Sequence, residues 1–321
     1  MKSRQIMVCA LWLSAAAGAH AQNYPDKAVR VVVPFPPGGA ADIVGRAITQ
    51  KLAEVLGKPF PVDNRSGAGG ALGADLVAHA APDGYTLLFA SSSSLSVSPH
   101  LMRKPPYDPL RDLAPVVLIG HTPNLLVIHF SVPAKSVKQL IALAKAKPGE
   151  LVFASNGTGS LGHLTTELFM QRAGIKMLHV PYRGGAPAMI DTVAGNTSVL
   201  FAAFSTVYTQ VLAGKLRALA VTTPRRIQAA PELPTVAESA LPGFESTQWW
   251  GIYGPAGLPA AIVAKLNESV NKILGSADIR ERLAVEATEP LGGTPADLVR
   301  YHKADYERWG KVVRDAGIRP D

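Results

Sequence analysis

Residues 151–169 read LVFASNGTGSLGHLTTELF and contain the pattern from which the fold can be inferred. A short apolar run, 151–154, is followed by the glycine-rich segment 157–162 and then by an apolar-periodic segment. This order predicts a buried strand, a tight loop and a helix. Glycines let the backbone approach an anion closely, and unpaired N–H groups at the start of a helix face that anion. The stretch therefore predicts an anion-binding turn in an α/β protein.

The same order of strand, turn and helix recurs along the chain. Apolar runs typical of buried strands lie at 29–33, 60–63, 86–90, 177–180 and 216–222. Most lead into a segment rich in Gly, Pro or Ser, and apolar residues at helical spacing follow, as at 43–55. Two further helical patterns, 262–274 and 295–313, lie near the end of the chain. Strands that alternate with helices predict α/β layers with mostly parallel sheets.

Two stretches have a different pattern. Residues 116–130 are apolar on both sides of a short polar segment, and residues 244–253 form a second extended candidate. Each could carry the chain from one domain to another. If both do, lobe 2 is an insertion of residues 124–245 within lobe 1, which consists of residues 22–123 and 246–321. A ligand would then bind in the cleft between the lobes.

The N-terminus has the features of a secretory signal peptide. Lys2 and Arg4 precede an apolar stretch at 6–13 and an Ala-rich segment that ends at Ala21, after which we expect cleavage. The apolar stretch is well short of the roughly 20 residues that span a bilayer. Residues 1–21 are therefore expected to be removed on export to the periplasm. Because the only cysteine, Cys9, lies there, the mature chain would have no disulfide and no thiolate.

The charge balance is moderately basic. Removing Lys2 and Arg4 lowers the formal net charge from +8 to +6. Such a field would help to steer small anions, although a merely solvated basic surface has the same composition. The chain has no dense run of Lys and Arg and no basic segment interleaved with aromatic residues, so we expect no nucleic-acid partner.

The glycine-rich segment also matches GxGxxG, the pattern of a dinucleotide-binding loop. That interpretation needs an acidic residue about 20 positions further on, to hold the ribose. Residues 179–183 contain none, and the nearest later acid is Asp191. An exported protein also does not normally meet a nucleotide pool. We therefore expect no cofactor.

Catalytic and metal sites have little support in the sequence. A GxSxG nucleophile motif around Ser160 would need glycine at position 158, where the chain has Thr158. No HxH or HExxH pair occurs among the histidines, so a zinc site lacks local support. His163 stands apart because it lies one turn inside the predicted helix. A hydrolase that uses Ser160 and His163 remains the enzymatic alternative.

What remains is a set of loops after predicted strands, rich in Gly, Ser and Thr. They lie at 34–42, 66–70, 91–94, 157–163 and 182–186. In parallel α/β sheets such loops gather at the carboxyl ends of the strands, where ligands bind. Backbone N–H groups and small hydroxyls suit a carboxylate, and no paired carboxylates are present in these loops for acid–base work. The loops therefore favour a binding protein without catalytic activity.

Several fragments, in this order, resemble the Bug family, the extracytoplasmic solute receptors of tripartite tricarboxylate transporters. They are VPFPPGGAAD (33–42), NRSGAGG (64–70), PDGYTLL (82–88), VPYRG (180–184), AGKLRALA (213–220) and PTVAE (234–238). The resemblance runs from about residue 24 to residue 318. Each fragment is weakly diagnostic by itself, whereas the ordered set is specific.

The resemblance implies a type II periplasmic-binding-protein fold, with two α/β lobes, two crossover strands and a ligand cleft between the lobes. It also implies a small carboxylate ligand, a monomeric receptor and, as partners, the membrane components of such a transporter. On matching positions, with Ser91 added from the serine loop, it gives this set of ligand-binding residues: Phe35, Pro36, Gly39, Ala40, Asp42, Ser91, Thr158, Gly159, Ser160, His163, Tyr182, Gly184 and Ala202.

One departure from the family concerns the ligand. After a strand near 199–201 the family commonly has an aspartate, often followed by asparagine, whereas this chain has Ala202 and Ala203. Such an aspartate would reach an ammonium or hydroxyl group, so its absence favours a ligand with a less polar distal end. We expect a simple or aromatic carboxylate. A sensory binder that signals through another protein is a second alternative, since it would use the same fold.

Overall fold

The computed structural model describes residues 24–318, so the predicted signal peptide lies outside the described residues. Within them the strands form one ten-stranded sheet in the order β2-β1-β3-β9-β4-β7-β5-β6, in which β10 and β8 also pair with β4. The strands are β1 (Arg30–Val33), β2 (Val62–Asn64), β3 (Thr86–Ser91), β4 (Leu113–His129), β5 (Val152–Ser155), β6 (Leu178–Pro181), β7 (Val199–Ala203), β8 (Leu216–Val221), β9 (Thr247–Pro255) and β10 (Glu289–Pro290).

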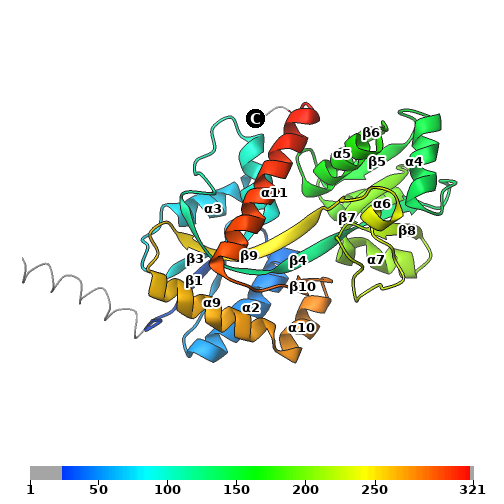
Figure 1. Ribbon diagram of the computed structural model, residues 1–321. Helices are drawn as coiled ribbons and strands as arrows, with labels where there is room; N and C mark the ends of the chain where they lie inside the picture. The colour runs from blue at the N-terminus through cyan, green and yellow to red at the C-terminus, as the bar shows by residue number, and fades with distance from the viewer. Residues whose placement is uncertain (1–23, 319–321) are drawn as a thin grey trace, which may run out of the picture.

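Helices cover the sheet in two groups (Figure 1). Around its first half lie α2 (Ala40–Leu56), α3 (Ala71–Ala78), α9 (Ala260–Leu274), α10 (Ala277–Ala284), α11 (Pro295–Asp315) and the short helices η1 (Ala68–Gly70), η2 (Ser93–Val97) and η3 (Ser98–Leu101). Around its second half lie α4 (Val137–Ala146), α5 (Leu161–Ala173), α6 (Gly185–Val193), α7 (Phe204–Leu212) and α8 (Val236–Ser239).

Each half is built on parallel strands. In the first, β1 pairs in parallel with β2 and β3, and in the second β5 pairs in parallel with β6 and β7. Three consecutive valines of β1 are fully buried, as a strand covered on both faces requires. Helix α2 follows β1 and ends at Gly57, which has a left-handed φ of 70°. These strand-and-helix units are those the apolar patterns predict.

Strand β4 passes from one half to the other (Figure 1). Its first part pairs with β9 as far as Pro123↔Thr247, and its second part pairs with β7 from Asn124↔Ala203 onward. All pairings of β4 and β9 are antiparallel, so the prediction of mostly parallel sheets was only partly right. The reason is that β4 leaves the first half while β9 returns to it in the opposite direction. The lobe boundaries given above stay a prediction.

Helix α11, red in Figure 1, packs against both halves. Leu298 near its start packs in the apolar cluster of Leu88 and Tyr253, whereas Trp309 packs with Phe169 of α5. Trp309 is completely buried. The C-terminal helix is therefore shared between the cores of the two halves.

Candidate functional site

The turn after β1 is held in place by Asp42. Its carboxylate accepts hydrogen bonds from the Gly38 N–H at 2.9 Å and from the Asn64 side-chain amide at 3.0 Å, and it pairs with Arg46 at 2.9 Å. The same Asn64 amide donates to the Phe35 carbonyl at 3.0 Å. Burial opposes ionisation, but the hydrogen bonds from Arg46, Gly38 and Asn64 outweigh it and lower the pKa of Asp42. An ionised, buried Asp42 shapes the turn, and its charge would repel a ligand carboxylate.

The other predicted residues of this turn form its surface. Pro36 and Gly39 are exposed, and Phe35 and Ala40 are half-buried. The ring of Phe35 lies close to Gly70, since a Cβ added there would sit 3.1 Å from its Cζ. Backbone groups and one aromatic ring are thus what the turn can offer to a ligand.

Ser91, at the end of β3, has internal hydrogen-bond partners. Its hydroxyl lies 3.3 Å from that of Ser94, its N–H donates to Ser94 Oγ at 3.1 Å, and the side chain is fully buried. The segment 91–94 does not form the loop that the sequence suggests, because the chain turns into the π-helical η2. These serines fix the start of η2, and a ligand contact of Ser91 stays a prediction.

The sequence predicts a tight glycine-rich loop between a strand and a helix, and this loop lies between β5 and α5; that it binds an anion stays a prediction. Gly157 and Gly159 have positive φ values of 126° and 74°, which L side chains rarely adopt. Ser160 is the N-cap of α5, and its hydroxyl accepts from the His163 backbone N–H at 3.3 Å. Thr158 is exposed at the tip of the loop.

His163 is not a surface residue of the loop. Its side chain is buried, its Nδ1 accepts from the Gly159 N–H at 3.1 Å, and its Nε2 lies 3.5 Å from Glu167 Oε1. The ring nitrogens therefore face the loop backbone and Glu167. Ser160 Oγ is bonded to the His163 backbone and has no hydrogen bond with the imidazole in this structure. Ser160 and His163 thus do not form the serine–histidine pair that a hydrolase needs.

Tyr182, Gly184 and Ala202 complete the second group. The Tyr182 hydroxyl donates to Asp191, and burial together with this carboxylate raises the pKa of Tyr182 to about 12. Gly184, with φ of 114°, is the N-cap of α6. Ala202 is only 2% exposed and packs in an apolar cluster that also contains Tyr182. Nothing polar stands at position 202 to contact a ligand.

The structure thus brings the predicted residues together in two groups. One lies at the ends of β1 and β3, and the other at the ends of the neighbouring strands β5, β6 and β7. Leu101 of η3 links the halves, since a Cβ on Gly159 would lie 2.5 Å from its Cδ1. Any larger residue at 159 would have to displace Leu101 and adopt a positive φ of 74°.

Sequence reasoning missed two asparagines. Asn64 bridges Asp42 and Phe35, and Asn156 is exposed beside Thr158 at the end of β5. Asn64 directly follows the predicted strand 60–63 and Asn156 lies two residues after the predicted strand 151–154, in the region where ligand-facing polar residues gather in α/β sheets. That position was the available signal.

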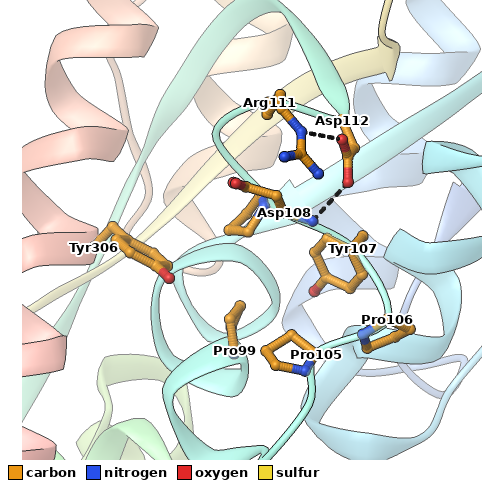
Figure 2. Close-up of a pocket in the computed structure, with 9 residues that line it drawn as sticks. Pro99, Pro105, Pro106, Tyr107, Asp108, Arg111, Asp112 and Tyr306 are labelled. Carbon is orange, nitrogen blue, oxygen red and sulfur yellow. Dashed lines mark hydrogen bonds and ion pairs between the residues drawn. The ribbon is translucent and has the colours of Figure 1, made fainter.

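A pocket of about 330 Å³ lies elsewhere, between the segment before β4 and helix α11 (Figure 2). It is lined by prolines, Tyr107, Tyr306, Asp108, Asp112 and Arg111. Arg111 is paired with Asp112 at 2.9 Å, which leaves acidic groups and apolar rings facing the space. This composition does not suit an anion, so we do not assign the ligand site to this pocket.

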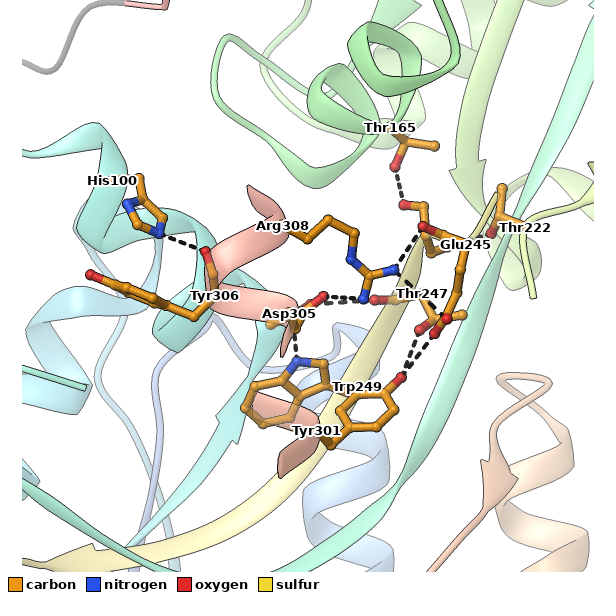
Figure 3. A network of polar contacts seen from close by, with 12 residues as sticks. His100, Thr165, Thr222, Glu245, Thr247, Trp249, Tyr301, Asp305, Tyr306 and Arg308 are labelled. Carbon is orange, nitrogen blue, oxygen red and sulfur yellow. Dashed lines mark hydrogen bonds and ion pairs between the residues drawn. The ribbon is translucent and has the colours of Figure 1, made fainter. Parts of the chain in front are cut away.

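A polar network surrounds the point where β9 begins (Figure 3). Asp305 of α11 is buried and accepts from Trp249 Nε1 at 2.7 Å and from Arg308 at 2.9 Å. Arg308 donates to the Glu245 carbonyl at 3.0 Å. On the other side, Ser246 contacts Thr165 of α5 through their hydroxyls. The segment where β9 begins is thus hydrogen-bonded both to α11 and to α5 of the second half.

Residues 24–318 meet neither the requirements of a metal site nor those of a membrane-spanning helix. No group of three or more His, Cys, Asp or Glu side chains in this range could hold a metal ion. None of the helices described there combines the length and the apolar character needed to cross a membrane.

These features define a class of protein. Two α/β halves joined by extended strands, with backbone-rich turns at the strand ends of each, form the architecture of a two-lobe solute-binding protein. The family model described as "tripartite tricarboxylate transporter family receptor" matches residues 44–318. The chain belongs to this family, which confirms the resemblance to the Bug receptors.

Three solved structures are similar to this chain. Rpa4515 of R. palustris, described with adipate, is 38% identical with a TM-score of 0.81, covering 93% of this chain and 100% of that chain. The periplasmic binding protein BugD is 31% identical with a TM-score of 0.76, at the same coverage. MatC of Rhodopseudomonas palustris, described with bound malate, is 33% identical with a TM-score of 0.75, covering 90% and 100%. The predicted fold is confirmed, and the chain is a receptor rather than an enzyme.

Proposed function

We propose that this receptor captures a small carboxylate in the periplasm by closing its two lobes, and that it delivers the ligand to the membrane components of a tripartite tricarboxylate transporter. The glycine-rich turn at the start of α5 carries the proposal, since it exposes the polar residues Asn156 and Thr158 and its Ser160 forms no catalytic pair with His163. The adipate and malate bound to two similar proteins support a carboxylate ligand. The N-terminal sequence supports export.

The ligand class follows from the end of β7. Ala202 and Ala203 offer methyl groups where the family commonly has an acidic side chain, and Ala202 is buried. A hydroxyl or ammonium group on the ligand would find no carboxylate there. We propose a carboxylate with an apolar middle or distal part, and adipate, whose carboxylates are joined by methylenes, is the first candidate.

Closure is the proposed mechanism. The predicted contacts lie on both halves, and a ligand that touches both binds the closed arrangement better and shifts the population towards it. A micromolar ligand supplies about 8 kcal/mol, which is ample for a closure that costs a few. We propose residues 22–123 with 246–321, and residues 124–245, as the two moving lobes. Small-angle X-ray scattering should show compaction at saturating ligand, and an unchanged radius of gyration would refute closure.

The binding test is a thermal-shift screen of the mature protein, refolded from denaturant to remove carried-over ligand. The panel contains aliphatic dicarboxylates, malate, tricarboxylates, amino dicarboxylates and aromatic acids. A ligand at 100 times its Kd adds about 2.7 kcal/mol of stability. A response confined to simple or aromatic carboxylates supports the proposal, whereas silence across the panel contradicts it. Hydrolysis of ester substrates that is lost in Ser160→Ala would instead favour the enzymatic alternative.

Delivery is tested with the membrane partner. Vesicles that contain the transporter's membrane components should accumulate labelled ligand only when the loaded receptor is added, and a receptor that binds ligand without supporting uptake would favour the sensory alternative. Size-exclusion chromatography with light scattering checks the expected monomer.

A further inference from the structure

Three rings are stacked beneath the glycine-rich loop. Phe153 of β5 and His179 of β6 are direct neighbours in the parallel register, with ring centroids 4.7 Å apart and planes at 14°. His163 of α5 lies on His179 at 4.0 Å and 8°. His179 and Ser155 are not among the predicted ligand contacts. Both nevertheless lie next to the glycine-rich loop, which contains several of those contacts.

The Ser155 hydroxyl joins His179 to the loop. Its Oγ lies 2.7 Å from His179 Nε2 and 3.2 Å from both the nitrogen and the carbonyl oxygen of Gly157. A hydroxyl donates one hydrogen bond and accepts two. Its one proton goes either to the Gly157 carbonyl, with His179 Nε2–H donating to the hydroxyl, or to His179 Nε2; in both arrangements the hydroxyl accepts from the Gly157 N–H. The fully buried Ser155 thus links His179 to the backbone of Gly157.

His163 holds the next glycine in the same way. Its Nδ1 accepts from the Gly159 N–H at 3.1 Å, so this nitrogen carries no proton and the Nε2–H faces Glu167. Gly157 and Gly159 both have positive φ values. Because glycine adopts other backbone conformations at little cost, the loop would change its shape easily without these hydrogen bonds. Two side chains below the loop thus bind the N–H groups of Gly157 and Gly159.

These bonds determine which groups of the loop are available to a ligand. The N–H groups of Gly157 and Gly159 point down to Ser155 and His163, so they are committed within the protein. Asn156 and Thr158, which alternate with these glycines, are exposed. Holding Gly157 and Gly159 in place therefore also fixes the orientation of Asn156, which precedes them, and of Thr158, which lies between them.

We propose that His179 and Ser155 are positioning residues for ligand binding: through the His179–Ser155–Gly157 chain they hold the loop in the conformation that presents Asn156 and Thr158 to a carboxylate. This inference rests on the proposed carboxylate-binding function. Burial, with a smaller contribution from the adjacent His163, lowers the pKa of His179 to about 4, so the ring is neutral near pH 7 and keeps its hydrogen bond with Ser155. A loop ordered before binding loses less entropy when the ligand arrives.

The test separates the two properties of His179, its stacking and its hydrogen bond with Ser155. His179→Phe keeps a flat ring beside Phe153 and His163 but has no polar atom, whereas His179→Gln keeps an amide that can donate to or accept from the hydroxyl but has no ring. Ser155→Ala removes the bridge itself. The matched control is His129→Phe, because His129 also contacts a serine hydroxyl, that of Ser131 at 2.7 Å, at the far end of β4.

Isothermal titration calorimetry with adipate, or with the acid that the thermal-shift screen selects, gives the expected result. His179→Phe and Ser155→Ala should raise the Kd about tenfold, the equivalent of one hydrogen bond, while His179→Gln and His129→Phe stay within about twofold of wild type. Thermal melts without ligand show whether each variant is folded at the assay temperature, and a role in stability alone would lower the melting point without changing the Kd.

Two results would overturn the inference. One is a wild-type Kd in both His179→Phe and Ser155→Ala, and the other is an equal loss in His179→Gln and His179→Phe, which would assign the effect to stacking. If wild type itself binds no carboxylate, the proposed function fails, and that outcome is distinct because it appears before any variant is compared. If a variant does not fold, Ser155→Thr, which keeps the hydroxyl, must bind like wild type for the proposal to stand.

Discussion

Lowering the pH from 7 to 5 should destabilise the protein, and His302 should account for about 2 kcal/mol of that loss. This histidine of α11 is 2% exposed, its Nδ1 lies 3.1 Å from the Tyr253 hydroxyl, and its Nε2 lies 3.3 Å from the Leu95 carbonyl. The carbonyl can only accept, so Nε2 carries the proton and Nδ1 accepts from Tyr253. The imidazole is therefore neutral and satisfied on both sides.

The magnitude follows from proton linkage. Burial lowers the pKa of His302 from 6.5 to about 4, while the Leu95 carbonyl and Asp108 oppose the shift weakly. The unfolded chain takes up its proton near pH 6.5 and the folded chain only near pH 4, so stability falls as the pH drops through this window and levels off below it. Inserting both values into the linkage relation gives a loss of about 2 kcal/mol between pH 7 and pH 5.

The assay is urea denaturation of wild type and His302→Gln at pH 7, 6 and 5. His179 also has a lowered pKa, and burial raises the pKa of Asp305, which acts in the opposite direction. His179 and Asp305 are present in both wild type and His302→Gln. The difference between the two proteins in how the free energy of unfolding changes with pH therefore reports on His302 alone. The slope should be shallower in His302→Gln by about 1 kcal/mol per pH unit. Equal slopes would refute the reasoning.

Three further changes have definite expected outcomes. Ala202→Asp places a carboxylate in an apolar cluster next to the proposed ligand, so the Kd for a simple dicarboxylate should rise at least tenfold in calorimetry, with Ala202→Asn as the uncharged control; unchanged affinity would remove position 202 from the site. Ser160→Ala removes the acceptor of the His163 N–H, and urea denaturation should show a loss of about 1 kcal/mol; no loss would contradict the capping role. Asp305→Ala leaves the buried Trp249 N–H without a partner and should cost at least about 2 kcal/mol in the same assay; a smaller change would show that water replaces the carboxylate.

The sequence predicts the local units of this fold well, because their signals are local. The valine run of β1, the glycine that ends α2 and the serine that caps α5 each act within a few residues of their own position. The loops at the ends of β1 and β5 were located for the same reason. Membership of the receptor family was also recognisable, since its fragments are spread over almost the whole chain in a fixed order.

Contacts between segments that are far apart in the chain could not be predicted from such local signals. His163 is predicted as a ligand contact because it follows the loop by one turn, and that contact stays a prediction; the sequence does not reveal that its ring stacks on His179, sixteen residues further along. That stacking depends on the register of β5 and β6, which no local pattern specifies. Ser91 is a similar case, since its hydroxyl is satisfied by Ser94 in a π-helical turn that the serine run does not reveal.

Helix α11 shows what this non-local packing means for the receptor. By its place in the chain the helix was assigned to lobe 1, yet Trp309 and Val313 pack in the same apolar cluster as Phe169 of the second half, while Asp305 is bonded to Trp249 of β9. A closing movement must therefore either carry the end of α11 along with α5 or separate Trp309 from Phe169. Separation would expose a completely buried indole at a cost of about 2 kcal/mol or more, so a movement that keeps this contact is favoured.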